Sequence, residues 1–411
     1  MLAGEAGPIL RKAMEIIVAL GKIYGASDLV PVKSVQIAGV SYKNLGDAGL
    51  EFLREWADQG ARARVPATLN PAGMDLSRWK ELGIPEAFAR AQLAVIEAYQ
   101  RMGIELTLTC TPYLVGNRPQ LGEHVAWSES SAVAFANAVL GARTNREGGP
   151  SALAAALTGK TARYGLHLDE NRLATHLIDV RCPLRSIADV GALGALVGRL
   201  VRDGVPYFKN LDMSGLAQRE DALKALGAAM AASGAVGLYH VEGITPEAGL
   251  PDILARLPSG SAAIVIDDLT PGYAMLNGRL ERIDFVGLGC PHASLEEVKE
   301  IAMMLAGKRV KTLLWVMVAE AVRQEAERCG WVRLIEEAGG HVVADTCLVV
   351  APVEALGVRS LATNSAKAAL YAVSHAGLQT RFGTMEQCVE AALTGIWPSP
   401  AYYTPICKAK N

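Results

Sequence analysis

Apolar residues along the chain follow two alternating periods, which predict alternating strands and helices. Short apolar runs of strand length lie at residues 30–39, 63–69, 104–109, 235–240, 262–267, 283–288, 312–318 and 341–345. Between them, apolar positions recur at helical spacing at residues 46–60, 85–103, 128–141, 191–204, 294–307 and 384–395. Such alternation is typical of α/β layers built on largely parallel sheets. We therefore expect an α/β fold.

The length of the chain, 411 residues, favours two or three domains over one. Residues 181–189 and the region near Pro352 are the best candidate boundaries. They divide the chain into an N-terminal α/β part (1–180), a middle α/β part (181–351) and a C-terminal helical part that closes the site (352–411).

The first 25 residues are apolar enough to suggest an export signal, but charges interrupt the run. Arg11, Lys12 and Glu15 fall within it, and no small-residue cleavage site follows. An amphipathic helix that begins at Pro8 is the better interpretation. No stretch is long and apolar enough to span a membrane, so we expect a cytoplasmic protein.

Charge narrows the class of ligand. The chain has 40 basic and 42 acidic residues, a net charge of -2, and no run of Lys or Arg. A nucleic-acid-binding protein normally carries a basic patch or stripe. An RNA-binding function is therefore the weaker alternative, and a small-molecule ligand is expected.

Three of the seven cysteines share a position relative to the predicted strands. Cys110 follows the run 104–109, Cys290 follows 283–288, and Cys347 follows 341–345. Ligands collect at the carboxyl ends of strands in α/β sheets, so distant cysteines can converge there. A single buried cysteine is more often a packing residue. The remaining cysteines lack this context: Cys182, Cys329, Cys388 and Cys407.

The number three has a chemical meaning. Thiolates are the usual ligands of iron–sulfur clusters. A 4Fe–4S cluster held by three cysteines leaves one iron open to a substrate hydroxyl or carboxylate. An open iron is a Lewis acid. Three cysteines thus favour dehydration over electron transfer.

The segment 109–172 resembles the aconitase X family, through CTPYLVGNRP, SESSAVAFANAVLG and ARTNREGGPSALAAALTG. The resemblance continues through GVSYKNLGDAG, PATLNPAGMD, GLGCPHASLEE and TNSAKAALY. These separate motifs extend over nearly the whole chain.

The resemblance implies an aconitase-like α/β architecture with several subdomains around a central cleft. It also implies a hydro-lyase whose 4Fe–4S cluster is held by Cys110, Cys290 and Cys347. The sequences of these motifs resemble the archaeal members more closely. Those members convert (R)-5-phosphomevalonate to trans-anhydromevalonate 5-phosphate in the mevalonate pathway of isoprenoid biosynthesis. Other members dehydrate cis-3-hydroxy-L-proline, and this alternative stays open. In two-component members a separate small subunit completes the heteromer, and we expect it to supply the catalytic base.

Two strand ends are expected to contact substrate. Gly39, Val40 and Ser41 offer backbone N–H groups and a hydroxyl to an anion, although an ordinary strand-to-helix turn would look the same. Asn70 and Pro71 form a turn in which the amide could hold a carboxylate. The resemblance favours substrate contact at both places.

Two helix starts add charged candidates. Glu129 and Ser130 begin the helix 128–141, where Ser128 is the expected cap. Glu129 and Ser130 are expected to contact substrate, and a carboxylic acid there could protonate departing water. Lys367 follows the expected cap Ser365, where a cation opposes the helix dipole. That misfit favours a phosphate or carboxylate ligand over a solvated lysine.

Two more side chains are secondary candidates. Arg143 and Arg146 precede a Gly-Gly-Pro-Ser helix start and could form an anion cradle. Alternatively, they pair with acidic residues and order the loop. His124 and His292 lie beside the expected cluster motifs and could tune the site through hydrogen bonds, but the ordinary interpretation is that both are structural histidines.

Overall fold

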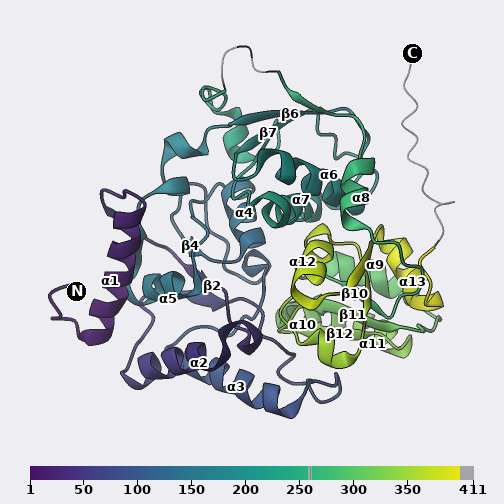
Figure 1. Ribbon diagram of the computed structural model, residues 1–411, viewed down its shortest axis with the longest axis horizontal. Coiled ribbons are helices and arrows are strands. Elements are labelled where there is room, and N and C mark those ends of the chain that lie inside the picture. The colour runs from purple at the N-terminus through teal and green to yellow at the C-terminus, as the bar shows by residue number, and fades with distance from the viewer. Residues whose placement is uncertain (258–259, 261, 399–411) are drawn as a thin grey trace.

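The computed structural model describes residues 1–257, 260 and 262–398, so the expectation about Cys407 lies outside the described residues. It confirms the predicted α/β class with largely parallel sheets. Three parallel sheets lie in three consecutive stretches of the chain, and one small antiparallel pair accompanies the first. Figure 1 shows the three stretches as separate groups of helices around their strands.

The first sheet has the strand order β3-β2-β4 and is parallel throughout. Its strands are β2 (Val35–Ile37), β3 (Ala67–Leu69) and β4 (Ala126–Trp127), and the antiparallel pair is β1 (Leu29–Pro31) with β5 (Lys160–Ala162). The helices of this stretch are α1 (Pro8–Ile23), α2 (Tyr42–Asp58), α3 (Glu86–Arg101), α4 (Ser130–Ala138) and α5 (Gly149–Thr158). Apolar faces of these elements form one buried core.

The second sheet has the order β8-β7-β6-β9, again parallel. Its strands are β6 (His176–Val180), β7 (Pro206–Lys209), β8 (His240–Val241) and β9 (Ile264–Ile266). Its helices are α6 (Ile187–Val201), α7 (Arg219–Gly234) and α8 (Thr270–Leu276).

The third sheet has the order β12-β11-β10-β13-β14. Its strands are β10 (Phe285–Leu288), β11 (Leu313–Val318), β12 (His341–Ala344), β13 (Ser360–Thr363) and β14 (Gln379–Phe382). Its helices are α9 (Leu295–Leu305), α10 (Glu320–Arg328), α11 (Trp331–Glu337), α12 (Ala366–Ala376) and α13 (Met385–Thr394). Because β13 pairs with β10, residues beyond 352 belong to the same sheet as those before it. The proposed division into 1–180, 181–351 and 352–411 stays a prediction.

Two predicted strands do not form over most of their length. Residues 235–239 are irregular, and only His240 belongs to a strand, β8. Residues 104–109 run beside β3 and bond to it from Glu105 N and Thr109 N, but they form no regular ladder. Leu108 has φ 44°, a left-handed conformation that a strand cannot contain. Cys110 nevertheless lies beyond the end of β3, as the apolar run suggests.

Helix α7 is the element that joins the three stretches. It packs on α6 of its own stretch, on α4 of the first and on α12 of the third. Glycines allow the close approach of α6 and α7: a Cβ at Gly194 would lie 2.7 Å from Ala229 Cβ and 2.8 Å from Leu226 O. The starts of α4 and α12 are thereby held near the same helix.

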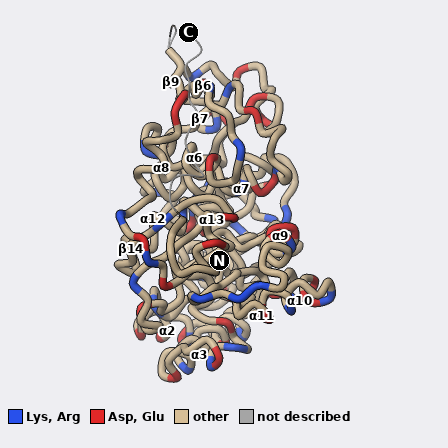
Figure 2. Tube along the Cα trace, turned by 90° about the vertical axis from the view of Figure 1, so that its right-hand side faces the viewer, with Lys and Arg blue, Asp and Glu red and all other residues tan. Residues whose placement is uncertain are grey.

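In the view of Figure 2, positions of Lys and Arg are interspersed with positions of Asp and Glu along the Cα trace of the described residues. This distribution gives no support to RNA binding. Of the helices described, none combines the length and apolar character needed to cross a bilayer.

We predict that Gly194→Ala destabilises the protein. A helical Gly→Ala change normally stabilises by about 0.5–1 kcal/mol, but here the added methyl group overlaps α7, and overpacking typically costs about 1–3 kcal/mol. Thermal denaturation should show a lower Tm for this variant than for Gly249→Ala, whose added methyl would meet nothing within 4 Å. Equal Tm values would contradict the close-packing account.

Candidate active site

A buried ion pair lies where the first and third stretches meet. Glu129 is the N-cap of α4, and Lys367 lies in the first turn of α12. Lys367 Nζ donates to Glu129 Oε1, and the two side chains are only 6% and 13% exposed for Lys367 and Glu129. Lys367 also donates to Ser131 Oγ at 3.2 Å. The ordinary dipole conflict of a first-turn lysine is thus offset by a carboxylate from another part of the chain.

Two amides from the first sheet hold Glu129 in place. Asn70 Nδ2 donates to Glu129 Oε2 at 2.8 Å, and Gln36 Nε2 donates to Asn70 Oδ1 at 3.1 Å. Gln36 Oε1 accepts from the backbone N–H of Glu129 at 3.0 Å. Ser130 Oγ reaches the same carboxylate at 3.4 Å. The structure therefore brings together Asn70, Glu129, Ser130 and Lys367.

The pKa of Glu129 is lowered to about 2, because the Lys367 charge and hydrogen bonds outweigh the raising effect of burial. The pKa of Lys367 is raised: burial opposes the charged ammonium, but Glu129 stabilises it. Both groups are therefore ionised near neutral pH. Glu129 in this arrangement is an acceptor, which argues against the expected role of proton donor.

The three cysteines converge beside this pair. Cys110, Cys290 and Cys347 are buried and free of disulfides. Each is close enough to another of the three, and to Lys367 and Glu129, for their charges to affect its pKa. Burial raises the pKa of all three thiols to about 12, and the Lys367 charge opposes that rise.

One thiol has a hydrogen-bond donor from a neighbouring segment: His292 N donates to Cys110 Sγ at 3.2 Å. Ser365 lies close enough to Cys290, and the backbone N–H of Val349 close enough to Cys347, to lower the pKa of each thiol in part. Hydrogen bonds to sulfur are one of the ways a protein tunes an iron–sulfur cluster.

Three further hydroxyls of these loops are buried and have no hydrogen-bond partner within the described part of the chain: Tyr113, Ser128 and Thr346. Buried polar groups are normally satisfied, so such orphans indicate room for an acceptor. Cluster sulfides are acceptors. Across the described residues, no three His, Cys, Asp or Glu side chains could enclose one metal ion. The described residues therefore form no compact mononuclear metal site. Three thiols with buried hydroxyl donors beside them are groups that an iron–sulfur cluster would use.

The loop at the start of α2 lies against the segment that follows Cys347. Ser41 Oγ donates to Val350 O at 2.8 Å and also caps α2, so its hydroxyl is already engaged. Gln92 Nε2 donates to Val40 O at 3.0 Å, and Gln92 Oε1 accepts from Gly73 N. A Cβ at Gly73 would lie 2.6 Å from Ser41 Oγ.

Gly39 and Pro71 lie in the same loops and contribute no polar side chain. Gly39 has φ 76°, which turns the chain after β2. Pro71 is buried, and Ala72 next to it donates its N–H to Asp345 O at 2.7 Å. Ala72, directly after Pro71, therefore joins the first stretch to the residue that follows β12.

Arg143 and Arg146 differ in their contacts. Arg143 pairs with Asp169 and donates to His167 O at 3.3 Å, as expected of a loop-ordering residue. Arg146 is exposed. It lies two residues before Gly148, the N-cap of α5, which has no side-chain cap, and the first turn of α5 has no acidic residue. Of the pair, Arg146 is the side chain available to an anion.

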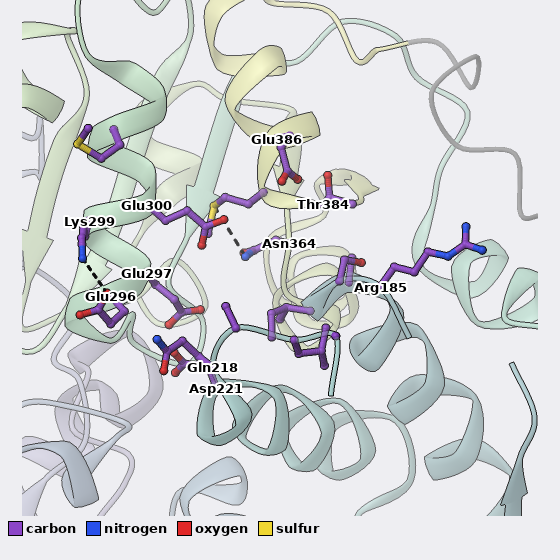
Figure 3. A pocket seen from close by; sticks show the side chains of 18 residues that line it. Arg185, Gln218, Asp221, Glu296, Glu297, Lys299, Glu300, Asn364, Thr384 and Glu386 are labelled. Carbon is purple, nitrogen blue, oxygen red and sulfur yellow. Dashed lines mark hydrogen bonds and ion pairs between the residues drawn. The ribbon is translucent and has the colours of Figure 1, made fainter. Parts of the chain in front are cut away.

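A cavity of about 440 Å³ lies between the starts of α6, α7, α9 and α13, shown in Figure 3. Its charged lining is mainly acidic, because Asp221, Glu296, Glu297, Glu300 and Glu386 outnumber Arg185 and Lys299. The neighbouring carboxylates, together with burial, raise the pKa of Glu300. This cavity is therefore unsuited to an anionic substrate.

Sequence reasoning missed four supporting residues: Gln36, Gln92, Ser131 and Thr109. It also assigned the cap of α4 to Ser128, whereas the Glu129 side chain accepts from Ser131 N. The available signal was position alone: Gln36 is a polar residue inside an apolar strand run, and such a residue needs buried partners.

Comparison with known proteins identifies the family of this chain. The first, second and third domains of aconitase X match residues 1–170, 174–269 and 283–394. The chain therefore belongs to the aconitase X family, and it is a dehydratase, that is, a hydro-lyase.

The similar proteins are named more specifically. The chain is 49% identical to the phosphomevalonate dehydratase large subunit of Methanocaldococcus jannaschii, over 95% of this chain and 97% of that protein. It is 52% identical to the protein of the same name from Methanothermobacter thermautotrophicus, over 92% and 93%. The crystal structure of Thermococcus kodakaraensis aconitase X in its holo-form superposes with a TM-score of 0.86 at 48% identity, covering 95% of this chain and 97% of that one. A cis-3-hydroxy-L-proline dehydratase from Pseudomonas aeruginosa is 38% identical, over 99% of this chain and 71% of its own length.

We predict that Lys367→Met destabilises the cluster-free chain by about 3–5 kcal/mol, because it leaves a buried carboxylate without its partner. The lowered pKa of Glu129 means that its stabilising contribution is present above its ordinary pKa of 4.5 and is lost toward pH 2. In the variant, burial instead raises that pKa. The stability gap between wild type and Lys367→Met should therefore narrow as the pH falls from about 7 to about 5.

Denaturant unfolding at several pH values measures this gap. Lys299→Met is the matched control, because Lys299 is half-exposed and pairs with Glu296 on the surface. A gap for Lys367→Met that does not change with pH would contradict the assignment of an ionised, buried pair.

Proposed function

We propose that this chain is the large subunit of a heteromeric dehydratase that converts (R)-5-phosphomevalonate to trans-anhydromevalonate 5-phosphate in the mevalonate pathway of isoprenoid biosynthesis. The observation that carries the proposal is the convergence of three buried cysteines on the Glu129–Lys367 pair. Identities near 50% to proteins named for this activity support the choice of substrate.

Cys110, Cys290 and Cys347 are the residues that would hold a 4Fe–4S cluster. When bound through three thiolates, such a cluster supplies one iron as a Lewis acid for a hydroxyl leaving group. The orphaned hydroxyl of Thr346, next to Cys347, is a donor that its sulfides could accept from.

Lys367 is proposed to hold the hydroxy-acid end of the substrate. It lies within electrostatic reach of all three cysteines, so its ammonium is near the reacting carbon atoms. Of the two anions considered for Lys367, phosphate and carboxylate, we therefore propose the carboxylate. Asn70 and Ser130 would complete the contacts at that end, because both already converge on Glu129.

Dehydration breaks the C–O bond of the hydroxyl and removes a proton from the carbon next to the carboxylate. Glu129 is ionised but engaged by Lys367, Asn70 and Ser131, so it is poorly suited to remove that proton in this arrangement. The relatives' designation as large subunits supports a separate small subunit, and we assign the base to it.

The phosphate end is proposed to lie between Arg146, the start of α5 and the Gly39–Ser41 loop. Gly149 at the start of α5 approaches that loop closely, since a Cβ there would lie 2.8 Å from Ala38 O. Free N–H groups at a helix start, without acidic residues in the first turn, favour phosphate.

The experiment is an anaerobic assay. The chain is co-expressed with a candidate small subunit and reconstituted with iron and sulfide, and each substrate is followed by proton NMR. We expect a new vinylic proton from phosphomevalonate, and no turnover by the large subunit alone. Turnover of cis-3-hydroxy-L-proline instead would contradict the substrate while leaving the dehydratase chemistry intact. Turnover by the large subunit alone would contradict the assignment of the base.

Arg146→Ala should raise the KM for phosphomevalonate about 10- to 100-fold with little change in kcat, because a charged hydrogen bond contributes about 1.5–3 kcal/mol. Steady-state kinetics measures this split. Arg333→Ala serves as the control, since Arg333 is 77% exposed and pairs with Glu337 on α11. Equal KM values for the two variants would remove Arg146 from the phosphate site.

A further inference from the structure

His292 lies two residues after Cys290 and is fully buried. Its ring and backbone together make four hydrogen bonds to three separate segments of the chain. Two of these segments carry the other cysteines, Cys110 and Cys347, and one is helix α7.

The His292 ring connects the Cys290 loop to the Cys110 loop and to the Cys347 loop. Nε2 lies 2.9 Å from Thr346 O, and Nδ1 lies 2.9 Å from Thr109 Oγ1. A carbonyl oxygen only accepts, so Nε2 carries the proton. With the proton on Nε2, Nδ1 of the neutral ring accepts from the Thr109 hydroxyl. Thr346 precedes Cys347, and Thr109 precedes Cys110.

The backbone of His292 completes the set. Its N–H donates to Cys110 Sγ at 3.2 Å. Its carbonyl accepts from Lys224 Nζ at 3.4 Å, and that ammonium is buried between Asp221 and Glu297. The Cys290 loop is thereby anchored to α7, the helix on which α4 and α12 also pack.

We propose that His292 is the positioning residue for all three cysteine thiols, so that its imidazole sets their mutual placement before any cluster binds. The proposal deepens the proposed function, because the thiols it places are the proposed cluster ligands. His292 acts through Thr109 and Thr346 and does not itself touch substrate.

The first test uses the full cluster-free chain and therefore does not depend on the cluster. Cysteine alkylation by iodoacetamide under anaerobic conditions is followed at each residue by mass spectrometry. We expect His292→Leu to accelerate alkylation of Cys110, Cys290 and Cys347 together, by about 10-fold or more. The acceleration follows because the loops lose their shared connection.

Matched variants separate positioning from loss of stability. His240→Leu removes another fully buried histidine, whose Nε2 bonds to Arg172 O at 2.8 Å, far along the chain from any cysteine loop. His292→Gln retains an N–H for Thr346 O, so its rates should lie between those of wild type and His292→Leu. If His292→Leu does not fold, the comparison of His292→Gln with His240→Leu still decides the matter.

The second test uses the reconstituted protein. Loss of the cluster's visible absorbance to a chelator should be about 10- to 100-fold faster in His292→Leu, as is usual when a supporting hydrogen bond to a metal site is removed. The electron paramagnetic resonance signal of the reduced cluster should also shift, whereas His240→Leu leaves it unchanged.

Each outcome has one meaning. Alkylation rates equal to those of His240→Leu, or acceleration at Cys290 alone, would overturn the positioning role. If wild type itself assembles no cluster, the proposed function fails, and the alkylation rates alone decide the role of His292. A selective effect at all three thiols supports the inference in either case.

Discussion

The buried ion pair between Glu129 and Lys367 is the interaction on which the site depends. Two opposite charges removed from water are tolerated only when each has close partners, because desolvation costs several kcal/mol per ion. Glu129 is contributed by the first stretch of the chain and Lys367 by the third. The pair can therefore form only when both stretches are packed on α7. The geometry of the proposed active site thus depends on how the two stretches are packed.

The parallel sheets explain why the cysteines meet at this pair. Cys290 and Cys347 follow β10 and β12 of one sheet, so their loops emerge at the same edge. Cys110 comes from the first stretch, whose Ala72 bonds to the backbone of Asp345 at the end of β12. Backbone contacts between two sheets thus bring three distant thiols together, and His292 and Lys224 connect them to α7.

Much of the fold was predictable from the apolar periods, since most long helices and the strands β10, β11 and β12 coincide with predicted runs. Strands β4, β5, β6, β7, β13 and β14 were not predicted, because they are short or mix polar with apolar residues, whereas β10 and β12 are nearly continuous apolar runs. The cysteines and Lys367 were predictable because a strand end and a helix start have positional meaning. Gln36 and Gln92 were not, because a buried amide is identified only by the partners that tertiary packing provides. The irregular backbone at Leu108 likewise comes from tertiary context, against its local β propensity.

The central claim is that three cysteines beside Lys367 leave one iron open to substrate. Mössbauer spectroscopy of the protein reconstituted with ⁵⁷Fe tests it most directly. The account predicts one iron subsite that is distinct from the rest and changes its spectrum when (R)-5-phosphomevalonate is added. A cluster whose irons are all unaffected by the substrate would contradict it.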